Sequence, residues 1–107
     1  GFLARVQQAA ATLADGLAAI ATRHAAVVHE VRGMGLLRAI DLRADAPFGP
    51  AALGTAAREE GLLLVRGGDR ALRLLPPLTV TDDEIHEALA RLDAALTRLS
   101  LTEGAAS

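Results

Sequence analysis

The sequence predicts an α+β fold, a small antiparallel sheet of three to four strands covered on one side by helices. Two long stretches of the 107-residue chain carry apolar residues at alternating spacings of three and four, which is typical of amphipathic helices. Between them lie short apolar and β-branched runs separated by Gly and Pro, which is typical of strands and turns. Helices with a single apolar face need a sheet face to cover.

The first element is predicted to be one amphipathic helix over residues 2–23. Gly16 lies inside it and costs up to about 1 kcal/mol relative to Ala, but the apolar stripe outweighs this cost. The chain starts at Gly1, within the helical pattern, and lacks the charged start and apolar stretch of a signal peptide. We therefore expect a piece of a longer protein. The stripe consists of Leu3, Val6, Ala10, Leu13, Leu17 and Ile20.

Extended chain is predicted after this helix. The β-branched residues within 27–31 precede a glycine-rich bend at 32–35 and an apolar run at 36–42, which predicts two short strands or one kinked strand. The Pro- and Gly-rich segment 46–50 predicts a loop. Because proline suits the first position of a helix, we expect a short helix over 50–60.

A hairpin and a long helix are predicted to complete the fold. The runs 62–65 and 71–75 flank a five-residue glycine-rich loop, and two prolines at 76–77 end the second strand. Thr81 and Glu84 have the spacing of a capping box and mark the start of the last helix. We expect the domain to span residues 1–101, with 102–107 as a flexible tail. The apolar stripe of the last helix consists of Ile85, Leu89, Leu92, Leu96 and Leu99.

Composition excludes several classes of protein. With 51% hydrophobic residues, 2% aromatic residues and a mean hydropathy of +0.31, the chain is typical of a globular domain with an aliphatic core. Its 11 basic and 13 acidic residues give a net charge of -2, so we expect no nucleic-acid partner. No membrane span is predicted, and the cytoplasm is the default location. The chain has no Cys, and all 11 of its basic residues are Arg.

Three familiar kinds of site are not predicted. His24, His29 and His86 include no pair at the helical i, i+4 spacing of a metal site, so we expect capping or surface roles and no metal. The acidic residues 82–84 complement the first turn of a capped helix. The glycines at 67–68 precede a strand, whereas a phosphate-binding loop precedes a helix N-terminus.

Arg73 is the candidate functional residue. Strand alternation places Leu72 and Leu74 on one face of the strand and Arg73 on the other, among aliphatic neighbours and directly before the prolines. A guanidinium binds a carboxylate through two hydrogen bonds and stays charged near neutral pH. The alternative is an edge-strand Arg with its head in water. Arg38 shares a face with apolar residues, which indicates either a bulged strand or a polar partner on that face.

Three blocks of sequence carry a family resemblance, namely EVRGMGLLRAIDL at 30–42, AREEGLLL at 57–64 and LRLLPPLTV at 72–80. They resemble the C-terminal small domain of class III pyridoxal-phosphate aminotransferases, with the acetylornithine aminotransferase branch as the most similar. The resemblance covers residues 1–100 in the family's order, and its last block is the most specific. The chain departs from the family at three positions. The family often has a basic residue in place of Met34, an apolar residue in place of Arg38 and Gly in place of Ala39.

The resemblance implies a role for Arg73, because the Arg before the Leu-Leu-Pro-Pro stretch binds the α-carboxylate of the amino-acid or 2-oxoglutarate substrate in that family. It also implies pyridoxal phosphate, held as a Schiff base on a Lys. This chain has no Lys, so we expect no catalytic and no cofactor-binding residue in it, and no activity from the chain alone. A large domain of the same protein would supply those residues, in a cytoplasmic homodimer that moves the amino group of N-acetylornithine to 2-oxoglutarate in arginine biosynthesis.

Two other interpretations stay open. The same domain occurs in ornithine, succinylornithine and 4-aminobutyrate aminotransferases, whose pattern here is similar. The chain could instead be an autonomous α+β interaction or regulatory module. A domain from a larger protein should expose a contiguous apolar patch where its neighbour packs, whereas a free-standing module should not. A small-molecule sensing domain is disfavoured, because few aromatic residues are present to line a pocket.

Overall fold

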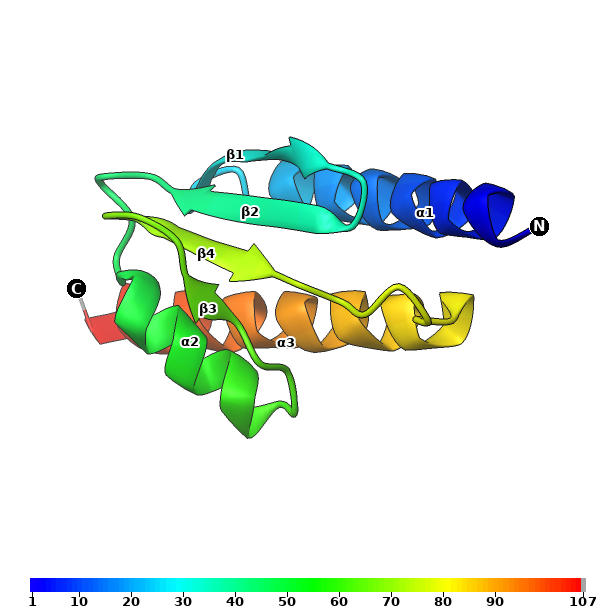
Figure 1. The fold of residues 1–107 in the computed structure, drawn as a ribbon. Helices are drawn as coiled ribbons and strands as arrows, with labels where there is room; N and C mark the ends of the chain where they lie inside the picture. The colour runs from blue at the N-terminus through cyan, green and yellow to red at the C-terminus, as the bar shows by residue number, and fades with distance from the viewer. Residues whose placement is uncertain (107) are drawn as a thin grey trace.

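The computed structural model describes residues 1–106 and has the predicted α+β fold. Its strands form one antiparallel sheet with the spatial order β1-β2-β4-β3. Helix α1 packs against α3 and β1, and α2 packs against α3, β3 and β4 (Figure 1). The elements are α1 (Phe2–Arg23), β1 (Val28–Met34), β2 (Leu37–Leu42), α2 (Pro50–Glu59), β3 (Val65–Arg66), β4 (Ala71–Leu74) and α3 (Asp82–Ala106).

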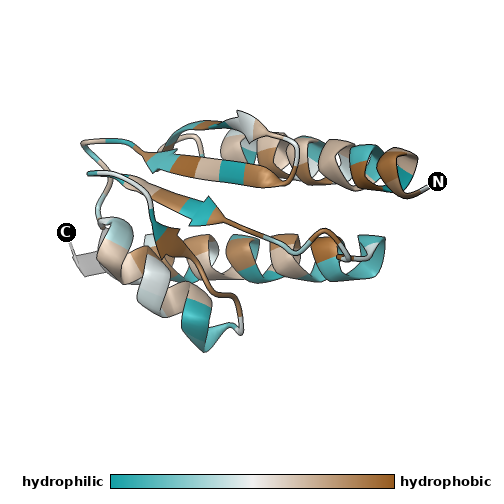
Figure 2. Cartoon of the chain, in the orientation of Figure 1, coloured by the Kyte–Doolittle hydropathy of each residue, from teal (hydrophilic) through white to brown (hydrophobic). Residues whose placement is uncertain are grey.

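The core is aliphatic, as the composition predicts. The brown apolar positions of Figure 2 recur along α1 and α3 at helical spacing. Gly16 of α1 lies where the two helices meet, and a Cβ at this position would collide with the Leu89 side chain. The glycine therefore permits the close approach of α1 and α3. The most completely buried side chains are Leu13, Leu17, Ile20, Ile40, Leu53, Leu72, Ile85, Leu92 and Leu96.

Of the two alternatives left by the sequence, two strands are correct, and a tight turn at residues 35–36 joins β1 to β2. The predicted bend at 32–35 is wrong in part, because residues 32–34 belong to β1. Met34 pairs with Leu37 across this turn. Gly33 has a φ of 137°, and a Cβ there would collide with the Leu37 carbonyl oxygen. Only glycine fits this backbone without strain. The register shifts once, between Val28 and Glu30 in β1.

The last helix begins as predicted. The backbone N–H of Thr81 donates to Oε1 of Glu84 at 2.9 Å, and the backbone N–H of Glu84 donates to Oγ1 of Thr81 at 3.1 Å, which confirms the capping box. Val80 and Ile85, on either side of this cap, are both buried. The cap therefore determines where α3 starts and how the chain enters it.

Besides the end of β1, two predicted boundaries differ from the structure by more than one residue. The strand predicted at 62–65 is reduced to Val65–Arg66, because Leu62 instead donates its N–H to Ala57 at the end of α2 and Leu64 is buried in the core. Helix α3 continues past Leu101 to Ala106, while Ser107 lies outside the described residues. The flexibility expected for 102–107 stays a prediction. None of the helices within residues 1–106 is both long enough and apolar enough to cross a membrane.

Candidate functional site

Strand β4 places Arg73 on the face of the sheet that the helices do not cover. Leu72 and Leu74 are buried at 1% and 4% exposure, whereas Arg73 between them is exposed. The predicted alternation is therefore present. In the sheet, Arg73 is flanked by Ala39 of β2 and Val65 of β3. The position of Arg73 in the strand is thus on an open face, between two apolar residues.

The aliphatic part of Arg73 lies over Gly67, which follows β3. A Cβ built on Gly67 would come within 2.6 Å of Nε and 2.7 Å of Cγ of Arg73. The N–H of Gly67 donates to the carbonyl of Ala71 at 3.0 Å, so the backbone continues the hairpin at this point. The missing side chain of the glycine therefore gives Arg73 its path across the sheet.

Among residues 1–102, whose side chains the structure describes, no carboxylate pairs with Arg73. The nearby acidic residue on this face, Asp41 of β2, is held by Arg32 of β1, whose Nε and Nη2 donate to the two carboxylate oxygens at 2.7 and 3.0 Å. This hydrogen-bonded guanidinium lowers the pKa of the Asp41 carboxyl below its ordinary value. Arg73 is thereby left with its hydrogen-bonding capacity free.

The partner of Arg38 is the backbone of the β1–β2 turn. Its Nε donates to the carbonyl of Gly35 at 2.8 Å, and its Nη1 donates to that of Gly33 at 3.3 Å. Of the two possibilities left by the sequence, a polar partner is therefore the correct one, since the register of β2 is regular and the irregularity lies in β1.

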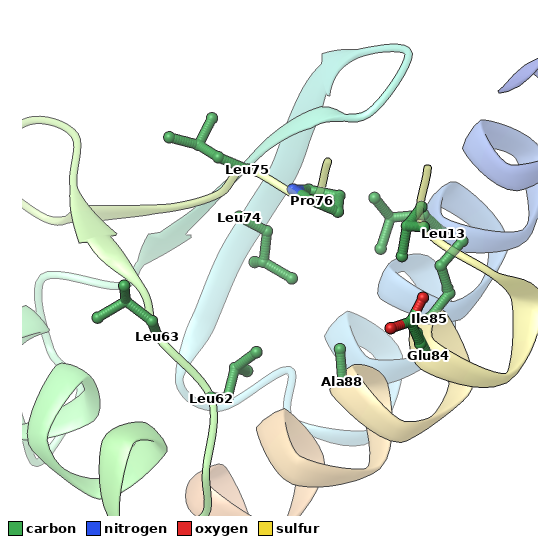
Figure 3. A pocket seen from close by; sticks show the side chains of 10 residues that line it. Leu13, Leu62, Leu63, Leu74, Leu75, Pro76, Glu84, Ile85 and Ala88 are labelled. Carbon is green, nitrogen blue, oxygen red and sulfur yellow. The ribbon is translucent and has the colours of Figure 1, made fainter. Parts of the chain in front are cut away.

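Two hollows lie near the end of the sheet that carries Arg73, and only one of them is lined by Arg73. One, of about 240 Å³, is lined by Arg32, Arg38 and Arg73 together with Gly33, Leu37 and Ala39. The other, of about 120 Å³, is mainly apolar and lies between the end of β4 and the helices, where it is lined by Leu13, Leu62, Leu74, Pro76 and Ile85 among others (Figure 3). The hollow lined by the three guanidinium-bearing residues suits a group that carries a carboxylate.

Three of the other features that the sequence singled out have structural roles. Nε2 of His24 lies 2.7 Å from Oδ1 of Asp93, which joins the end of α1 to α3. The acidic run 82–84 occupies the first turn of α3, as expected of a cap. The loop containing Gly67 and Gly68 joins two strands and precedes no helix. His29 and His86, the other two histidines, are exposed.

Sequence reasoning identified Arg73 but missed the residues around it. The contact with Gly67 and the pairing of Arg32 with Asp41 depend on side-chain directions across strands. One signal was available for the pair, because two strands joined by a tight turn bring residues nine apart to the same face. For Gly67 there was no signal beyond its place in a turn.

Comparisons with known proteins agree with this geometry. The family model described as Aminotransferase class-III matches residues 1–96. The chain is 46% identical over 100 residues to an acetylornithine aminotransferase of Mesorhizobium japonicum, covering 94% of the chain and 24% of that relative. It is 43% identical over 98 residues to an acetylornithine aminotransferase of a Nostoc species, covering 92% of the chain and 23% of that relative.

Solved structures give the same result. The N-acetylornithine aminotransferase of Stenotrophomonas maltophilia superposes with a TM-score of 0.84 at 35% identity, covering 94% of this chain and 28% of that one. The ornithine aminotransferase of Toxoplasma gondii superposes with a TM-score of 0.83 at 26% identity, covering 94% of this chain and 24% of that one. The chain therefore spans about a quarter of the length of the curated relatives it matches.

Proposed function

Because the chain belongs to the class III aminotransferase family, we propose that it is the substrate-carboxylate-binding small domain of an acetylornithine aminotransferase. The whole protein would transfer the amino group of N-acetylornithine to 2-oxoglutarate, a step of arginine biosynthesis. The names of relatives at 43–46% identity support this choice over ornithine, succinylornithine or 4-aminobutyrate as the amino donor. Within the chain, the small domain would comprise residues 1–101.

A single observation carries the proposal. Arg73 stands on the helix-free face of the sheet with no carboxylate partner among the described residues, while the carboxylate nearest to it in the register is bound by Arg32. An unpaired guanidinium beside apolar surface is a preformed site for a carboxylate, because it needs no internal ion pair to break first. We assign Arg73 to the α-carboxylate of the amino-acid or keto-acid substrate.

The family implies pyridoxal phosphate, which supplies an electron sink for the transfer of the amino group when it is bound. The residues of this chain do not fit its attachment, because all 11 basic residues are Arg and a guanidinium is no useful amine nucleophile. The Lys and the other cofactor-binding residues would belong to a large domain of the same protein. The 107-residue chain alone would then be inactive.

The proposed partner of the sheet is that large domain. Three apolar side chains share the helix-free side with Arg73 and are largely exposed, Leu37 at 54%, Val65 at 44% and Leu75 at 56%. Leu63 and Leu78, beside the end of β4, are exposed at 70% and 57%. An apolar patch of this kind marks an interface, and the relatives are about four times longer than this chain. We further propose a cytoplasmic homodimer for the whole protein.

The carboxylate role is tested by Arg73→Leu and Arg73→Lys in the full-length enzyme. Loss of a charged two-point contact should lower kcat/KM for 2-oxoglutarate by about 10- to 100-fold, with Lys retaining part of it. Arg58→Leu, on the exposed side of α2, serves as the control and should leave kcat/KM unchanged. Unchanged kinetics of both Arg73 variants with every dicarboxylate substrate would reject the assignment.

The proposal that the large domain holds the cofactor-binding residues is tested on the 107-residue chain. Purified 107-residue protein, treated with pyridoxal phosphate and then with borohydride, should carry no reduced pyridoxyl adduct on any side chain. It should also not exchange amino groups between substrates. A dye that binds apolar surface should bind the isolated chain and lose this binding when the chain is part of the full-length protein. A uniformly polar surface would instead favour an autonomous module.

A further inference from the structure

Arg73 has a second guanidinium on the same row of the sheet, separated from it by one alanine. Ala39 of β2 pairs with Arg32 of β1 on one side and with Arg73 of β4 on the other. In the next row, Asp41 of β2 pairs with Glu30 and with Ala71. Asp41 thus stands diagonal to both arginines on the same face, and diagonal positions on neighbouring strands are about 7–8 Å apart, a separation that long side chains bridge.

Only one of these two guanidiniums holds Asp41. Arg32 donates from Nε at 2.7 Å and from Nη2 at 3.0 Å to the two carboxylate oxygens. The Asp41 side chain is 20% exposed, so most of it is covered in this pair. Arg73 instead lies across Gly67, on the other side of its own strand.

We propose that Arg32 is a positioning residue that keeps Asp41 away from Arg73 and so leaves Arg73 available to the substrate carboxylate. This inference rests on the proposed function of Arg73 and adds the device that maintains it. Without Arg32, the Asp41 carboxylate would be free on the strand next to Arg73 and would compete with the substrate carboxylate for the Arg73 guanidinium. Because Asp41 belongs to the same chain, it would compete at a high effective concentration. Arg32 removes this competitor by binding it in the geometry that a guanidinium and a carboxylate prefer.

The second carboxylate of this face does not replace Asp41 in this role. Glu30 lies on the edge strand β1, with an oxygen 3.9 Å from Nε of Arg32, and its side chain is 55% exposed. Strand β2 separates it from the strand that carries Arg73. Loss of Arg32 would therefore release Asp41 toward Arg73, whereas Glu30 would stay at the edge of the sheet.

The test is a double-mutant cycle in the full-length aminotransferase, with Arg32→Gln, Asp41→Asn and the double variant. The binding constant of glutarate, a dicarboxylate that does not react, is measured by calorimetry, and KM and kcat are measured for 2-oxoglutarate. Arg32→Gln should weaken glutarate binding and raise KM by about three- to tenfold with little change in kcat. Asp41→Asn should change neither, and the double variant should recover the wild-type values.

The matched control is the Arg43–Asp45 pair, which has the same two-point geometry at 2.9 and 3.2 Å but lies after β2, outside the sheet. Arg43→Gln should leave glutarate binding unchanged. Arg32→Lys keeps the charge without the two-point geometry, so an intermediate effect is expected.

The outcomes separate this inference from the proposed function. If Arg73→Leu does not weaken glutarate binding, both are wrong. If Arg73→Leu weakens it but the double variant is as impaired as Arg32→Gln, then Arg32 acts by itself and the present inference alone is overturned. An unchanged binding constant in Arg32→Gln, or the same loss in Arg43→Gln, overturns it as well.

Discussion

The side chain of Arg73 lies across Gly67, with Nε only 2.6 Å from the place where a Cβ on that glycine would stand. The two residues come from opposite sides of the β3–β4 hairpin. The backbone of Gly67 is not among those with positive φ, so its conformation admits other residues. What a side chain at this position would disturb is the path of Arg73.

We therefore predict that Gly67→Ala leaves the fold intact and redirects Arg73. In the full-length enzyme, KM for 2-oxoglutarate should rise severalfold with a smaller change in kcat, because carboxylate binding is affected more than the reaction at the cofactor. Gly67→Val should have a larger effect. Gly54→Ala is the control, since nothing lies within 4 Å of a Cβ at that position. Wild-type KM in both Gly67 variants would contradict the prediction.

Two glycines within helices should respond in opposite directions to alanine. Gly54→Ala in α2 should stabilise the protein by up to about 1 kcal/mol, because open space surrounds the new methyl group and alanine favours the helix. Gly16→Ala in α1 should destabilise it, because the methyl group collides with Leu89 between α1 and α3. Urea unfolding measures both changes. An increase in the free energy of unfolding in Gly16→Ala would contradict the prediction for the contact between α1 and α3.

The capping box of α3 should contribute measurably to stability. Thr81→Ala removes the hydroxyl that accepts a hydrogen bond from the N–H of Glu84, and we expect a loss of about 0.5–2 kcal/mol in the free energy of unfolding. Thr12→Ala in α1 is the matched control. Its hydroxyl bonds only to the carbonyl of Gln8 within the helix, so its loss should be neutral or slightly stabilising. Equal effects of the two substitutions in thermal unfolding would contradict this.

Stability should depend on pH through Asp93. The hydrogen bond with His24, followed by that with Arg23, lowers the pKa of the Asp93 carboxyl below its ordinary value. A carboxyl with a lowered pKa in the folded state stabilises the protein above the pKa of the unfolded chain, and this contribution is lost as the pH falls through the folded value. Asp93→Asn should thus lower the free energy of unfolding at pH 7. The difference in this free energy between the variant and wild type should shrink below about pH 4.

Chemical unfolding at a series of pH values measures this dependence. Asp15→Asn, at an exposed position of α1 outside this contact, is the control and should show no such change in its difference from wild type. If the difference in the free energy of unfolding between Asp93→Asn and wild type stayed constant from pH 7 to about pH 3, the contacts of Asp93 with His24 and Arg23 would not be the source of the acid sensitivity.

The helices were predictable because their signals are local. The apolar stripe of α1 and the Thr81–Glu84 cap of α3 each depend on residues three or four apart, and the structure has α1 at Phe2–Arg23 as predicted. The hairpin was predicted with a first strand that is too long. Residues 62–64 look like a strand locally, but tertiary packing buries Leu64 and ties Leu62 to α2.

By itself, the sequence determined the fold class, the family and the face of β4 that carries Arg73, since helical periodicity, strand alternation and a short motif are all read along the chain. Only the tertiary structure decided what surrounds that guanidinium. The register of β2 against β4 pairs Ala39 with Arg73 and places Asp41 diagonal to it. Such a register joins residues far apart in the chain, and it depends on the packing of the whole sheet against its helices.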